Sequence, residues 1–149
     1  MDHESYMRMA LHQARLAWQR DEVPVGAIVV AENRVVGRGY NQSVWRTDPS
    51  AHAEIVALRR AAKVLGNYRL TSATLYCTLE PCAMCLGAMV LARVKALVYG
   101  TPDPKAGVVE SHLNLIESGI FNHRIQVHSG VLQAHCSRLL KGFFQSKRS

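Results

Sequence analysis

The motif PCAMC at residues 81–85 places two thiols three residues apart. Such a pair can form a redox dithiol, staple a loop, supply half of a structural zinc site or hold a catalytic metal. A thioredoxin-like pair is expected near the first strand–helix turn of a chain, so the redox interpretation fits poorly. A closed zinc site needs a second close pair of ligands, and neither Cys77 with Cys136 nor His123 with His128 has that spacing. An open site with three protein ligands is therefore favoured.

His52 is the candidate for the third ligand, and Glu54 follows it two residues later. HxE alone is a weak signal, but HxE followed by PCxxC, each at the start of a predicted helix, arises by chance in on the order of one in a thousand such chains. Two thiolates and a neutral imidazole balance the charge of Zn²⁺, and a water in the open position has its pKa lowered from about 15.7 toward about 7. Glu54 is then placed to move that water's proton. The alternative is that His52 and Glu54 merely cap the helix.

The hydrophobic pattern predicts the elements that position these residues. Strands are expected over residues 26–30, 34–39, 73–80, 96–100 and about 125–128, the first two forming a hairpin. Helices are expected over 4–20, 51–65, 81–94 (opened by Pro81), about 111–117 and about 131–146. This alternation predicts an α/β fold, a three-layer α/β/α sandwich in one domain over residues 1–149. Sites in such folds gather at strand ends and helix starts, where both ligand segments fall.

Composition narrows the class of protein. The chain has 149 residues, 48% of them hydrophobic, which is enough for a core without disulfides. It has no run of about 18 apolar residues and no signal core, so we expect no membrane span and a cytoplasmic location. A net charge of +7 and a pI near 9.6 favour polyanionic partners such as nucleic acid, although many small basic proteins bind none.

With HAE at 52–54 and TLEPCAMC at 78–85, the chain resembles the zinc-dependent nucleoside and nucleotide deaminase superfamily. Further segments resemble the bacterial tRNA-specific adenosine deaminases over roughly residues 6–148. They are EVPVGAIVV, GYNQ, DPSAHAEIVALR, NYRL, GTPDPKAG, NHR and LLKGFF. The resemblance implies a cytidine deaminase-like fold with a mixed central sheet of about five strands.

The resemblance also implies an activity: hydrolytic conversion of adenosine to inosine at the anticodon wobble position of tRNA, with release of ammonia. One Zn²⁺ per subunit would be held by His52, Cys82 and Cys85, and Glu54 would shuttle the proton. Members of the family are homodimers that bind the anticodon stem-loop with both subunits.

Substrate contacts carried over from the family are expected at several positions. Asn41 would read a base edge, while the amide near Ala53 and the main-chain carbonyl near Glu80 would frame the reacting base. Other contacts would come from Asp103 and Lys105 in the substrate-facing loop, and from Phe143, Lys147 and Arg148 near the C-terminus. Most of these residues have a simpler alternative. Asn41 could be a turn residue, Asp103 and Lys105 could form an ordinary polar loop, and Lys147 and Arg148 could belong to a solvated tail. At least one of Phe143 and Phe144 is expected in the core.

The sequence departs from the family where Val109 and Glu110 replace small residues after Gly107. Glu110 places negative charge near the presumed RNA-binding loop, which leaves substrate preference open. Two rival functions also stay open. One is deamination of a free base or nucleoside, such as cytosine or guanine, on the same fold. The other is a zinc-stabilised RNA-binding module without catalysis.

Overall fold

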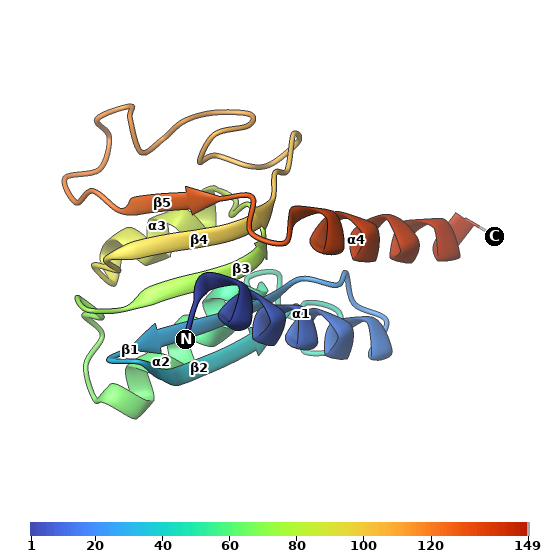
Figure 1. The fold of residues 1–149 in the computed structure, drawn as a ribbon, viewed down its shortest axis with the longest axis horizontal. Coiled ribbons are helices and arrows are strands. Elements are labelled where there is room, and N and C mark those ends of the chain that lie inside the picture. The colour runs from blue at the N-terminus through green and yellow to red at the C-terminus, as the bar shows by residue number, and fades with distance from the viewer. Residues whose placement is uncertain (149) are drawn as a thin grey trace.

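The computed structural model describes residues 1–148, which contain nine helices and strands in the order shown in Figure 1. The helices are α1 (His3–Gln19), α2 (Ala53–Leu65), α3 (Ala83–Leu91) and α4 (Gln133–Arg148). The strands are β1 (Gly26–Ala31), β2 (Arg34–Tyr40), β3 (Thr74–Leu79), β4 (Ala96–Thr101) and β5 (Gln126–Ser129). All five predicted strands and four of the five predicted helices are confirmed, with ends that shift by a few residues.

The five strands form one mixed sheet in the order β2-β1-β3-β4-β5. β1 is antiparallel to both of its neighbours, whereas β3, β4 and β5 are mutually parallel. Only β1 therefore runs against the other four strands. The chain after β2, β3, β4 and β5, and the chain leading into β1, consequently meet at one edge of the sheet, here called the carboxyl edge.

Helices cover both faces of the sheet and confirm the predicted three-layer sandwich. α2 and α3 pack on one face, and α1 and α4 pack on the other, where they extend toward the carboxyl edge (Figure 1). Alternate residues of the central strands face the two layers: Leu75 and Leu97 contact the α2–α3 layer, and Tyr76 and Val98 contact the α1–α4 layer. This alternation follows from the two-residue period of a strand.

Two glycines of β2 allow α2 to lie directly on the sheet. A Cβ atom at Gly37 would lie 2.3 Å from the carbonyl oxygen of Ala57, and one at Gly39 would lie 2.5 Å from that of Ala53. Any larger residue would push the helix away from the sheet. The close approach places the first turn of α2, and with it His52, against the end of β2.

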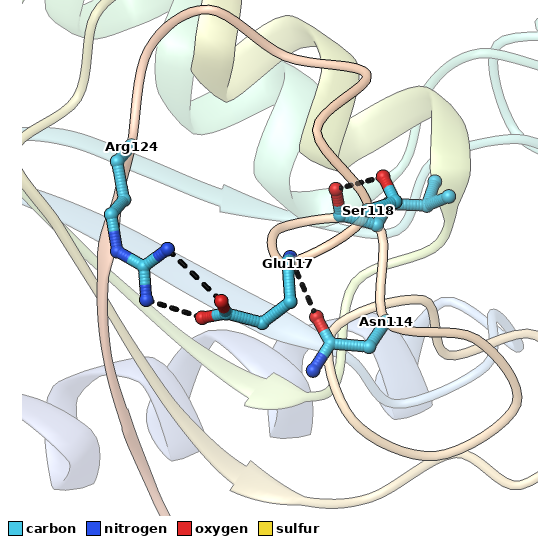
Figure 2. Close-up of polar contacts among 5 residues, drawn as sticks. Asn114, Glu117, Ser118 and Arg124 are labelled. Carbon is cyan, nitrogen blue, oxygen red and sulfur yellow. Dashed lines mark hydrogen bonds and ion pairs between the residues drawn. The ribbon is translucent and has the colours of Figure 1, made fainter.

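The predicted helix at residues 111–117 is wrong, because the segment forms a series of turns (Figure 2). The Glu117 N–H donates to the Asn114 side chain at 3.0 Å, and the Leu115 N–H donates to the Val108 carbonyl at 2.9 Å. These donors are thus unavailable to helical carbonyls. Arg124 forms an ion pair with Glu117 that ties the segment to the start of β5.

Among residues 1–148, none of the helices has the length and apolar character that a membrane span requires.

Candidate functional site

His52, Cys82 and Cys85 come together at the carboxyl edge. His52 is the N-cap of α2 and Cys82 is the N-cap of α3, and neither side chain makes a capping hydrogen bond. The His52 Nδ1 atom lies 3.6 Å from the Cys82 sulfur and 3.5 Å from the Cys85 sulfur, and all three atoms lie within 4.8 Å of one another. Nitrogen and sulfur ligands of a tetrahedral zinc ion are about 3.6 Å apart. The three side chains therefore fit one metal ion and leave a fourth position open.

The two thiols differ in their electrostatics, because the pKa of Cys82 is lowered and that of Cys85 is raised. A hydrogen bond from Cys85, followed by one from His52, lowers the pKa of Cys82 to about 3 despite partial burial. The pKa of Cys85 is raised, first because its proton is shared with Cys82 and second because it is buried. Cys82 therefore ionises more readily, and Cys85 keeps its proton more tightly. A bound cation displaces the remaining proton, because metals bind thiolate.

Glu54 lies in the first turn of α2 beside this triangle and is almost fully buried. Burial raises its pKa to about 7, although the charge of His52 acts in the opposite direction. A carboxyl group with a pKa near neutrality can both accept and release a proton at neutral pH. The simple capping interpretation of His52 finds no support here, since its imidazole caps nothing.

Asn41 links the end of β2 to the metal-ligand segment. Its Oδ1 atom accepts a hydrogen bond of 2.9 Å from the Ala53 N–H, and its own N–H donates to the Val25 carbonyl. This hydrogen bond uses the side-chain oxygen of Asn41 and does not use its amide nitrogen, which is a donor group. The Ala53 N–H, which was expected to frame a substrate base, has Asn41 as its partner in this structure.

Comparisons with known proteins agree with this geometry. The MafB19-like deaminase family model matches residues 1–148. A tRNA-specific adenosine deaminase of Haemophilus influenzae is 47% identical over 97% of this chain and 84% of its own length. A relative of the same name from Bacillus subtilis is 43% identical over 97% of this chain and 90% of its own. The chain belongs to the tRNA-specific adenosine deaminase family.

Solved deaminase structures superpose on this chain. A structure from a study of A-to-I editing by tRNA:A34 deaminases superposes with a TM-score of 0.89 at 43% identity, covering 91% of this chain and 99% of that one. A guanine deaminase from Nitrosomonas europaea superposes with a TM-score of 0.83 at 26% identity, covering 95% of this chain and 84% of that one. The fold is thus shared between deaminases of different substrates, so the pocket must set the substrate.

The buried carboxylate of Glu80 organises the loop that the family resemblance assigns to substrate. It accepts hydrogen bonds of 2.8–3.0 Å from the backbone N–H groups of Asp103, Val109, Glu110 and Ser111, and one more from the Ser111 hydroxyl. Burial acts to raise the pKa of Glu80, but these donors outweigh it and hold the pKa below its usual value. Sequence reasoning considered only the main-chain carbonyl here and missed the side chain. The available signal was an acidic residue directly after a buried strand.

Within this loop, Asp103 and Lys105 occupy a tight turn. The Asp103 carboxylate accepts hydrogen bonds from the Lys105 and Ala106 backbone N–H groups, and Lys105 is exposed. Both residues border a groove of ≈ 800 Å³ between the loop and α4, which the metal-ligand residues do not line. Their contact with substrate stays a prediction, as does that of the Glu80 carbonyl.

The unusual pair Val109 and Glu110 has a structural explanation in this chain. Val109 is buried in the core beneath the loop, and the Glu110 carboxylate accepts a hydrogen bond from the Tyr99 hydroxyl. The negative charge of Glu110 is therefore bound to a neighbouring strand.

The C-terminal residues divide into core and surface. Phe143 is only 5% exposed and packs edge-on against Trp18, which supports the core alternative and not a base-stacking role. Phe144 is 45% exposed and borders the groove. Lys147 forms an ion pair with Asp21, and Arg148 is exposed at the end of α4.

Replacing Glu80 with Gln is expected to loosen residues 103–111. A glutamine side chain has about the same volume, but its NH₂ group would face backbone N–H donors and could not accept from them. Each buried N–H left without an acceptor lowers the stability of the loop by about 1–3 kcal/mol. Hydrogen exchange should accelerate at Val109, Glu110 and Ser111 while the zinc content stays unchanged. Glu22→Gln is the matched control, because it should loosen Val44 and Trp45, whose N–H groups bind the Glu22 carboxylate. Equal exchange in Glu80→Gln and wild type would contradict this role.

Proposed function

We propose that this chain is a zinc-dependent tRNA deaminase that converts the adenosine at the anticodon wobble position to inosine. The observation that carries the proposal is the His52–Cys82–Cys85 triangle with buried Glu54 beside it, in a chain 47% identical to a tRNA-specific adenosine deaminase. The net charge of +7 suits an RNA substrate. As an enzyme that acts on tRNA, the protein is expected in the cytoplasm.

His52, Cys82 and Cys85 would hold one Zn²⁺ per chain. When bound, zinc lowers the pKa of water toward about 7 and so supplies a nucleophile at neutral pH. Buried Glu54 takes the proton from the attacking water and delivers it to N1 of adenine. After oxygen has bonded to C6, Glu54 takes a second proton from the new C6 hydroxyl and delivers it to the amino group. The bond from C6 to nitrogen then breaks, and ammonia leaves with inosine as the product.

Positioning of the base falls to groups around the pocket. The free amide nitrogen of Asn41 can donate to a base edge, while Asn41 Oδ1 fixes the start of α2 through Ala53. The Glu80 carboxylate holds the loop that carries Asp103 and Lys105. Lys147 and Arg148 at the end of α4 are proposed to contact phosphates.

The proposal predicts a large preference for RNA over free nucleoside. An anticodon stem-loop with adenosine at the wobble position should be deaminated with a kcat/KM at least about a hundredfold above that of free adenosine, because remote contacts contribute binding energy to the reaction. Inosine formation would be followed by sequencing for the RNA and by chromatography for the nucleoside. Comparable efficiency on both substrates would contradict the proposal.

Deamination of a free base is the second candidate function, because a guanine deaminase has the same fold. Assays with guanine, cytosine and their nucleosides alongside the stem-loop separate the two functions. A zinc-stabilised RNA-binding module without catalysis would bind the stem-loop and form no inosine from any RNA.

We also propose that the protein is a homodimer formed through the exposed apolar side of α3. Met84, Leu91 and Ile120 line a surface groove there, and Leu91 is 75% exposed. Leu91→Glu is expected to convert the dimer to a monomer in sedimentation velocity, because it buries an unpaired charge in the interface. Val64→Glu, which alters an exposed apolar residue of α2 outside this groove, should leave the mass unchanged. A wild-type monomer would refute the proposal.

A further inference from the structure

An exposed tryptophan flanked by two arginines lies at the carboxyl edge. Trp45 is 52% exposed, and the guanidinium carbons of Arg20 and Arg46 lie 4.3 Å and 5.2 Å from the centre of its ring. Arg20 ends α1, whereas Trp45 and Arg46 belong to the loop of residues 41–50. Both guanidinium groups are close enough to the indole ring for cation–π interactions. We call Arg20, Trp45 and Arg46 the Trp45 cluster.

The cluster is held in a fixed relation to the metal-ligand triangle. The buried carboxylate of Glu22 accepts hydrogen bonds of 3.2 Å from the Val44 N–H and 2.7 Å from the Trp45 N–H. The same loop runs from Asn41 to His52, and the Gln42 N–H donates to the Ala51 carbonyl at 2.9 Å. Trp45 thus sits on a braced loop whose two ends are both part of the site.

The charge around the cluster is positive. The nearby acids are engaged within the protein: Asp21 pairs with Lys147, Glu22 binds the loop amides, and Asp48 binds Ser50 and faces Arg59. The Asp21–Lys147 pair also brings the basic end of α4 beside the end of α1. Arg20, Arg46 and Arg148 are exposed cations that form no ion pair with another residue among residues 1–148.

We propose that the Trp45 cluster is a stacking platform for an RNA base outside the nucleotide that reacts, an inference that rests on the proposed function. Single-stranded bases stack on aromatic rings and on guanidinium planes, and cations beside the ring contact the phosphates. The indole of Trp45 can stack on a base, and the guanidinium groups of Arg20 and Arg46 can stack on a base or contact a phosphate. A splayed anticodon loop, which must deliver one base to the metal site, presents neighbouring bases to this surface.

The chain contains a matched control. Tyr68 is 66% exposed, and the Arg69 guanidinium lies 5.8 Å from its ring centre. This pair follows the C-terminal end of α2 and precedes β3, so it lies at the edge of the sheet opposite the metal ligands. It has the chemistry of the Trp45 cluster without its location.

The test compares Trp45→Ala, Trp45→Phe and Tyr68→Ala in the zinc-loaded protein. Trp45→Ala should weaken binding of a wobble-adenosine stem-loop about tenfold or more and raise KM similarly, the loss expected for one base–aromatic stack. The kcat, zinc content, melting temperature and activity on free adenosine should match wild type. Trp45→Phe should keep most of the binding, because a phenyl ring still stacks, and Tyr68→Ala should behave as wild type.

Fluorescence gives a readout independent of activity. Of the two tryptophans, Trp18 packs against Phe143 and Trp45 is exposed, so stem-loop titration should quench the emission that Trp45→Phe removes. The platform is refuted if Trp45→Ala binds RNA like Tyr68→Ala, or if its loss of binding accompanies a loss of stability or zinc. It is also refuted if anionic lipid vesicles, titrated in a parallel experiment, quench the Trp45 emission and the stem-loop does not. A wild-type protein that forms no inosine refutes the proposed function, while the binding and quenching results still decide the platform.

Discussion

Glu54→Gln is expected to lower kcat for inosine formation by a factor of about 10²–10⁴, the usual contribution of a positioned acid–base group. Glutamine fills the same buried space but cannot carry a proton from water to the base. Burial raises the Glu54 pKa to about 7, so the side chain can act as base and acid at neutral pH. The charge of a bound zinc ion lowers that pKa again, so kcat/KM should rise with pH on a limb centred below 7.

Three measurements accompany this variant. Zinc content and stem-loop binding should match wild type, because Glu54 is not needed as a ligand. Glu117→Gln, which removes the surface ion pair with Arg124, is the carboxylate control and should retain full activity. If Glu54→Gln keeps kcat within a factor of about ten, proton transfer must be assigned to another group.

Removal of the metal is expected to abolish activity completely and reversibly. Dialysis against a chelator should leave a protein that forms no inosine, and stoichiometric zinc should restore it. Cys85→Ser should not be restored, because a serine hydroxyl does not ionise near neutral pH and so cannot replace the thiolate. The chain should also melt at a lower temperature without zinc, since a ligand that binds only the folded state stabilises it.

Cys77→Ser is the matched control for this variant. Cys77 is as buried as Cys85, but its thiol donates to the Leu79 carbonyl, a role that a serine hydroxyl can take over. It should keep full zinc content measured by atomic absorption. Zinc bound by Cys85→Ser at the wild-type stoichiometry would show that the triangle of ligands has been wrongly identified.

The elements and the metal ligands could be predicted because their signals are local. A strand alternates with period two and a helix with period 3.6, so each pattern is visible within about ten residues. Cys82 and Cys85 are one helical turn apart, and their spacing alone places both thiols at one helix start. The same reasoning failed at residues 111–117, where a short helix was predicted and the segment forms turns. There, backbone donors bind the Asn114 side chain and the Val108 carbonyl instead.

Long-range partners decided the rest. The residue types of His52, Cys82 and Cys85 indicated a metal, but their approach to within 4.8 Å depends on β2 and β3 ending at one edge of the sheet. The role of the Glu80 carboxylate depends on N–H groups 23 to 31 residues further along the chain. The buried positions of a helix or strand recur with a fixed period, so they can be recognised from the sequence of that segment alone. A hydrogen bond between distant segments leaves no such pattern, because its geometry exists only after the sheet has brought those segments together.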